Sequence, residues 1–97
     1  MRPSNLSRHQ ALHELAKCIA FAKALAGGNE SSKSDVYWHT REKVMEIARS
    51  EYGFRIPEVL GCYKSQFTFG CDTRPEDNPF WFEVMHPDHL AAEVHTT

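Results

Sequence analysis

Long apolar runs are absent from this sequence of 97 residues. A helix that spans a bilayer needs roughly 20 apolar residues in succession, and no stretch approaches that length. The N-terminal residues, Met1 to Asn5, also lack the apolar core of a signal peptide. These absences predict a cytoplasmic protein that has no membrane partner.

Cysteine is scarce as well, and the chain has only Cys18, Cys62 and Cys71. An odd number leaves at least one cysteine without a disulfide partner, which argues against a disulfide framework. We expect Cys18 to be a small buried residue of a helix. The scarcity is consistent with a reducing compartment.

Catalytic and cofactor motifs are missing too. Gly27-Gly28 is not a phosphate-binding loop, because it follows a helical pattern and precedes no strand. Glu76 and Asp77 are adjacent loop carboxylates without the hydrophobic pocket that tunes a catalytic carboxyl group. No cysteine has the setting of an activated nucleophile. The sequence therefore predicts a non-enzymatic protein that needs no cofactor.

A zinc site would have to use Cys62, Cys71, His86 and His89, which are a Cys₂His₂ set by residue type. Paired cysteines of structural zinc sites usually stand about two to four residues apart on a tight turn. Cys62 and Cys71 are nine residues apart. We favour core thiols and surface histidines and expect no bound metal, with a zinc-stabilised adaptor as an alternative.

The first half of the chain has helical patterns. Ser7 and Gln10 have the spacing of a capping box, and apolar residues then recur at steps of three and four. A second such pattern ends at Gly53. A shorter second helix capped by Thr40 is the alternative. The predicted helices span 7–26 and 34–52.

After Gly53 the apolar residues follow a two-residue period instead. A short run behind Pro57 and an alternating run with Phe67, Phe69 and Cys71 are typical of strands joined by a hairpin. The predicted strands span 59–63, 66–71 and 80–85, and a short helix is predicted from Pro87 to Val94.

This order, α-α-β-β-β-α, predicts an α+β fold. The two N-terminal helices would pack on one face of a three-stranded antiparallel sheet, and the short helix would close the chain. A chain of this length buries only about two-thirds of its unfolded surface and has one modest core. We therefore expect a single domain over 1–97.

Charge is distributed unevenly, although the net charge is only −2. Residues 1–50 carry eight Lys or Arg against five Asp or Glu, an excess of three positive charges. Residues 51–97 carry three against eight, an excess of five negative charges. Such asymmetry indicates a charged partner, with an ordinary solvated acidic surface as the alternative.

The acidic half also contains the aromatic run Phe80-Trp81-Phe82. In a half-buried strand, Phe80 and Phe82 would face the core and Trp81 would face solvent. Carboxylates held in a row can imitate DNA phosphates, and exposed aromatics beside them would anchor a partner. Tyr63 is a second possible anchor. The predicted partner-binding residues are Asp72, Glu76, Asp77, Trp81, Glu83 and Asp88.

In size, charge layout and lack of enzymatic motifs, the chain resembles the small anti-defence proteins of phages and other mobile elements, the anti-CRISPR proteins. Some of these are acidic DNA mimics that occupy the DNA-binding surface of a CRISPR surveillance complex. The resemblance implies an inhibitor in the host cytoplasm that binds a basic DNA- or RNA-binding complex, such as a defence ribonucleoprotein. Direct binding of nucleic acid is not expected.

The alternative function is a small regulatory DNA-binding protein. The basic residues of the two N-terminal helices could contact phosphates. Against this, the segment between those helices is longer than the turn of a helix-turn-helix unit, and the net negative charge opposes accumulation on DNA.

Overall fold

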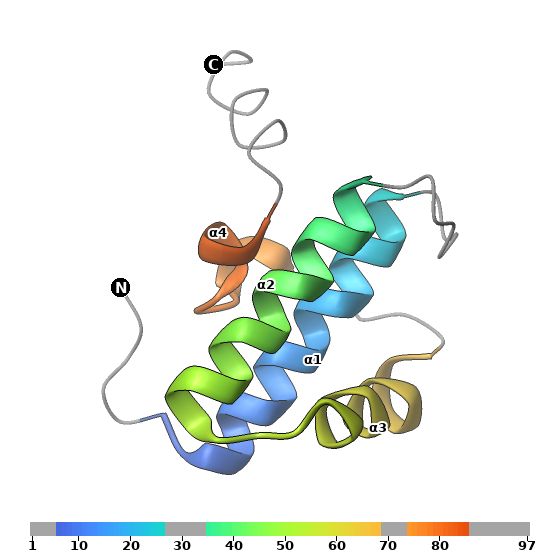
Figure 1. The fold of residues 1–97 in the computed structure, drawn as a ribbon. Helices are drawn as coiled ribbons and strands as arrows, with labels where there is room; N and C mark the ends of the chain where they lie inside the picture. The colour runs from blue at the N-terminus through green and yellow to red at the C-terminus, as the bar shows by residue number, and fades with distance from the viewer. Residues whose placement is uncertain (1–5, 27–34, 69–73, 86–97) are drawn as a thin grey trace.

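The computed structural model describes residues 6–26, 35–68 and 74–85. All regular structure in these ranges is helical: α1 (Arg8–Leu25), α2 (Asp35–Tyr52), α3 (Ile56–Phe67), the 3₁₀ turn η1 (Pro75–Asp77) and the single turn α4 (Trp81–Val84). Helices α1 and α2 lie side by side and antiparallel (Figure 1). Helix α3 lies on one side of this pair, and the segment η1–α4 lies on the other (Figure 1).

The predicted α+β fold is therefore wrong for the part of the chain that the structure describes. None of these residues forms a strand: residues 59–63 and 66–67 belong to α3, and residues 81–84 form the turn α4. The predicted helix after Pro87 and the end of the strand at Cys71 lie outside the described residues. No described helix is long and apolar enough to cross a membrane.

Helix α1 is the centre of the core, and its predicted start is confirmed. The Ser7 hydroxyl accepts a hydrogen bond from the Gln10 N–H at 3.1 Å, and the Gln10 side chain accepts from the Ser7 N–H at 3.0 Å. Beyond the first turn the helix contacts neighbours on several sides, so small residues fill much of its surface. Its buried residues are Ala11, Leu15, Ala16, Cys18, Ile19, Ala20, Phe21 and Ala22.

Helix α2 also matches its predicted range, and the shorter helix starting at Thr40 is wrong. Gly53 ends α2 with φ of 70°, a left-handed conformation that glycine adopts without steric penalty. Two backbone hydrogen bonds then satisfy carbonyl groups near the C-terminus of α2. The Gly53 N–H donates to the Arg49 carbonyl, and the Phe54 N–H donates to the Ala48 carbonyl. The chain turns at this point and enters α3 within three residues.

Arg8 joins the start of α1 to the end of α2. Its Nε donates to the Tyr52 carbonyl at 3.1 Å, and its guanidinium lies 4.3 Å from the centroid of the Phe54 ring. A cation beside the last carbonyls of a helix is favourable because those carbonyls carry partial negative charge. This contact fixes the antiparallel helix pair at one end.

Helix α3 forms where two strands were predicted. Pro57 is tolerated in the first turn of a helix, where backbone N–H groups have no intrahelical partner anyway. Val59, Tyr63 and Phe67 then follow at four-residue steps, and all three are buried. Phe67 contacts His13 of α1, with ring centroids 4.9 Å apart. As a helix, this segment of twelve residues buries one continuous apolar face. Two short strands would not place these three residues on one face.

Segment η1–α4 also has a helical burial pattern. Phe80, Trp81, Val84 and Met85 are buried, whereas Phe82 is 52% exposed. Residues that follow Phe80 by one, four and five positions lie on the same side of a helix. In a strand, Phe80 and Trp81 would point to opposite faces. The predicted assignment of Phe82 to the core and of Trp81 to solvent is therefore reversed.

Candidate functional site

An open groove of about 470 Å³ lies between the first turns of α1 and the segment η1–α4. We call it the acidic groove, because three carboxylate residues line it. Its lining residues are Leu6, Gln10, Glu14, Glu76, Asp77, Asn78, Pro79 and Phe82. Of the predicted partner-binding residues, Glu76 and Asp77 are brought together here.

Asn78 positions this groove. It is only 3% exposed, and its amide donates to the Glu14 carbonyl and to Glu14 Oε2, both at 2.9 Å. Its side-chain oxygen accepts from the Phe80 N–H at 2.8 Å and from the Cys18 thiol at 3.3 Å. A buried amide with every polar atom satisfied holds one orientation. Asn78 thereby fixes η1–α4 on α1.

Basic side chains partly neutralise the negative charge of the groove. Glu14 receives a bond from Lys17 at 3.1 Å, and Glu76 pairs with Arg74 at 2.7 Å. A backbone hydrogen bond, followed by the Arg74 side chain, lowers the pKa of Glu76, so this group is ionised at neutral pH. Asp77 makes no ion pair within the described residues and is exposed. The groove is therefore acidic, with its most available negative charge on Asp77.

The aromatic residue of the groove is Phe82 rather than Trp81. Trp81 is 3% exposed and packs edge-on against Phe21, with centroids 5.5 Å apart. Its predicted exposure is wrong, and so is that of Tyr63, which is 5% exposed. Glu83 is exposed but does not line the groove. Asp72 and Asp88 lie outside the described residues.

The zinc alternative involves one described residue. Cys62 of α3 is half-buried, and this burial raises the pKa of its thiol, which makes it a weaker nucleophile at neutral pH. Cys71, His86 and His89 lie outside the described ranges. Within those ranges, no three His, Cys, Asp or Glu side chains are grouped as metal ligands would be.

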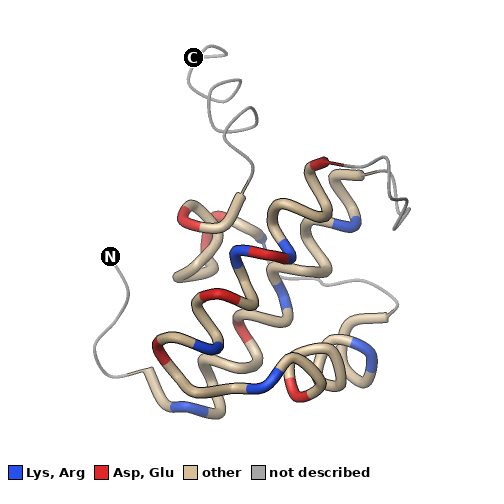
Figure 2. The backbone as a smooth tube through the Cα atoms, in the orientation of Figure 1, with Lys and Arg blue, Asp and Glu red and all other residues tan. Residues whose placement is uncertain are grey.

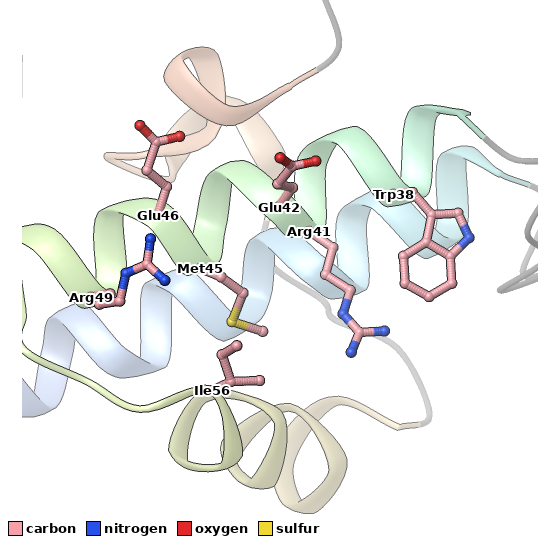
Figure 3. Close-up of a pocket in the computed structure, with 7 residues that line it drawn as sticks. All are labelled: Trp38, Arg41, Glu42, Met45, Glu46, Arg49 and Ile56. Atoms are coloured by element: carbon pink, nitrogen blue, oxygen red, sulfur yellow. The ribbon is translucent and has the colours of Figure 1, made fainter.

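A second open groove, of about 530 Å³, lies between α2 and the start of α3 (Figure 3). We call it the α2–α3 groove, and it was not anticipated from sequence. Trp38 is 39% exposed and Ile56 is 49% exposed, and the Arg41 guanidinium lies 4.8 Å from the Trp38 ring centroid. Its lining residues are Trp38, Arg41, Glu42, Met45, Glu46, Arg49 and Ile56. An apolar strip with both charge signs beside it is typical of a protein interface.

Comparison with known protein families, with curated proteins and with solved structures gives no match to this chain.

Proposed function

We propose that this chain is a non-enzymatic inhibitor of the anti-CRISPR kind that binds a basic, nucleic-acid-binding surface of another protein through its acidic groove. One observation carries the proposal: Phe82, a half-exposed aromatic ring, lines the same groove as Glu76 and Asp77. Charged residues steer a basic partner and set its orientation, and burial of an aromatic side chain supplies affinity.

The pairing of Glu76 with Arg74 is compatible with this role. The Arg74 side chain is 76% exposed and that of Glu76 is 48% exposed, and exposed ion pairs contribute little to stability. An arginine of a partner could therefore replace Arg74 without a large loss. The buried clamp at Asn78 supports the proposal in another way, because a rigid groove loses little conformational entropy on binding.

A second candidate function is DNA binding by α2 and α3. The link between them is the three residues Gly53-Phe54-Arg55, which is the length and composition of a helix-turn-helix turn. However, Glu58 is exposed in the first turn of α3, where a recognition helix contacts DNA. Figure 2 shows Lys and Arg interspersed with Asp and Glu along the helices. This mixture favours the inhibitor, and a gel shift with duplex DNA at low salt distinguishes the two.

The inhibitor proposal is tested with a purified multi-subunit CRISPR surveillance complex and its duplex DNA target. The added chain should reduce DNA binding, and the reduction should weaken as salt is raised, because screening reduces attraction between exposed charges. Glu76→Lys combined with Asp77→Lys should remove most of the inhibition. Phe82→Ala should weaken it without changing its salt dependence.

Glu58→Lys is the matched control, since it reverses an exposed acid on α3, which lies on the other side of the α1–α2 pair (Figure 1). It should inhibit as well as the parent chain. If the groove variants inhibit as well as the parent, the groove is not the binding surface. If the parent itself leaves DNA binding unchanged, this partner class is wrong.

A further inference from the structure

The α2–α3 groove has a regular stripe of exposed residues on one helix. Trp38, Glu42, Met45 and Arg49 are separated by steps of four, three and four, so they fall on one face of α2. Met45 points toward Ile56 of α3 at the middle of the groove (Figure 3). Trp38 and Ile56 are two of the four exposed large hydrophobic residues within the described ranges. This is the spacing with which helices pack on one another.

Two opposite charges on this stripe have no ion-pair partner among the residues that the structure describes. Neither Glu42 nor Arg49 forms an ion pair within the described residues. They are seven residues apart, about 10 Å along the helix, whereas side chains of one helix pair at spacings of three or four residues. Glu42 also stands four residues from Glu46, a like-charge spacing that weakens a helix. Lys43 contacts Glu46 at 3.7 Å and leaves Glu42 uncompensated.

We propose that a second copy of this chain covers the α2–α3 groove, with the two α2 helices packed antiparallel about a two-fold axis that passes between Met45 and Glu46. Reversal about this point brings Glu42 of each copy opposite Arg49 of the other. A two-fold interface repeats every contact, so one register forms two ion pairs at once. The pairing that does not form within one described helix is thus satisfied between two.

The same register accounts for the apolar residues. Met45 and Ile56 of both copies form the centre of the interface. Trp38 of each copy lies opposite Gly53 of the other, where a side-chain carbon would meet no atom within 4 Å, so the large ring has room. An association of this kind would also add buried apolar surface to a chain too short to bury a large core.

The charge pattern favours a second copy over nucleic acid as the occupant. Glu42 and Glu46 line the groove beside Arg41 and Arg49, so a strand of phosphates would meet as many carboxylates as guanidinium groups. A surface with both signs at a fixed spacing is complementary to itself when reversed. This inference is independent of the proposed function, which uses a different groove.

A charge-swap series tests the interface by sedimentation velocity of the full chain, over a range of concentrations and under reducing conditions. The parent should show a reversible monomer–dimer equilibrium. Glu42→Arg and Arg49→Glu should each weaken the dimer by at least about tenfold, because each places two like charges opposite one another twice. The double variant E42R/R49E restores the opposite charges and should recover most of the affinity.

Two further variants make every outcome informative. Trp38→Ala should also weaken the dimer. Arg74→Glu reverses an exposed charge at the start of η1, on the other side of the helix pair from α3 (Figure 1), and should leave the dimer unchanged. Circular dichroism confirms that each variant is folded. A parent that stays monomeric at millimolar concentration would overturn the proposal. So would a dimer that the single reversals leave intact, or a double variant that is no tighter than the singles.

Discussion

The side-chain amide of Asn78 donates to both the backbone carbonyl and the carboxylate of Glu14, each at 2.9 Å, across 64 positions of sequence. This pair connects the segment η1–α4 to the central helix α1. The segment contains only one 3₁₀ turn and one α-helical turn, which are too short to be stable alone. Its position therefore depends on this clamp and on the burial of Phe80 and Trp81.

Asn78→Ala should lower the free energy of unfolding by about 1–3 kcal/mol, because the buried Phe80 N–H and Glu14 carbonyl lose a hydrogen-bond partner. Urea denaturation measures the change. Asn78→Asp has nearly the same shape but places a second carboxylate beside that of Glu14. If Asn78→Ala has no effect, the clamp does not hold the segment.

The aspartate variant should also have a distinct pH dependence. Two adjacent carboxylates cannot both ionise easily, so the pKa of the new carboxyl should be raised above its value in the unfolded chain. A raised carboxyl pKa destabilises the folded state at neutral pH, and the loss should shrink as pH falls through that value. Asn78→Ala, which has no titratable group, should show no such recovery relative to the parent.

The two neighbouring aromatics of α4 should differ sharply in their contribution to stability. Trp81→Ala removes a ring buried against Phe21 and should cost about 3–5 kcal/mol. Phe82→Ala removes a ring that is 52% exposed and should change stability by less than about 0.5 kcal/mol. Thermal and urea unfolding measure both.

If Trp81→Ala does not fold, Trp81→Phe, which keeps a buried ring, can be measured in its place. A strand over these residues would give the opposite order, with the larger loss at Phe82. The ranking of the two variants therefore tests the helical turn directly.

The first two helices could be predicted from sequence because their signals are local. The Ser7–Gln10 capping box and the glycine at 53 mark helix ends within a few residues of the contacts that form there. The apolar pattern over each helix is long enough to distinguish a period of 3.6 residues from a period of two residues. These helices needed no information from distant parts of the chain.

Helix α3 was missed because a short apolar run fits both periods. Val59, Leu60 and Tyr63 suit a strand by residue type, but Val59, Tyr63 and Phe67 at four-residue steps favour a helix. The predicted exposure of Trp81 was wrong for the same reason, since the period decides whether Trp81 or Phe82 is exposed.

The role of Asn78 could not be predicted. The dipeptide Asn78-Pro79 indicates a turn, and the bond from its side chain to the Phe80 N–H is of this local kind. Its partners Glu14 and Cys18 lie more than half the chain away. No spacing rule connects such residues, because the contact exists only after α1 and η1–α4 have packed together.

Two exposed glycines should respond to alanine in opposite directions. Gly53 has a positive φ, whereas Gly61 lies within α3, and a side-chain carbon at either position would meet no atom within 4 Å. Gly53→Ala should lower stability by about 1 kcal/mol, because alanine is strained in the left-handed region. Gly61→Ala should raise stability by about 0.5–1 kcal/mol, because alanine favours a helix.

Urea denaturation of both glycine variants separates backbone conformation from packing, since neither methyl group touches a neighbour. Equal effects of the two substitutions would contradict the left-handed turn between α2 and α3.

Thr40 is a buried residue of α2 whose hydroxyl makes no hydrogen bond within the described residues. Burial of a hydroxyl without a partner is unfavourable, because its hydrogen bonds to water are lost and not replaced. Thr40→Val keeps the shape and replaces the hydroxyl with a methyl group. It should raise the free energy of unfolding by about 1 kcal/mol.

Thr40→Ser is the matched control, because it keeps the hydroxyl and removes the methyl group. It should lower stability by about 1 kcal/mol through loss of a buried methyl. A valine variant less stable than the parent would mean that the hydroxyl has a partner in solution. The two variants together separate the effect of the hydroxyl from that of packing at this position, because each removes one group and keeps the other.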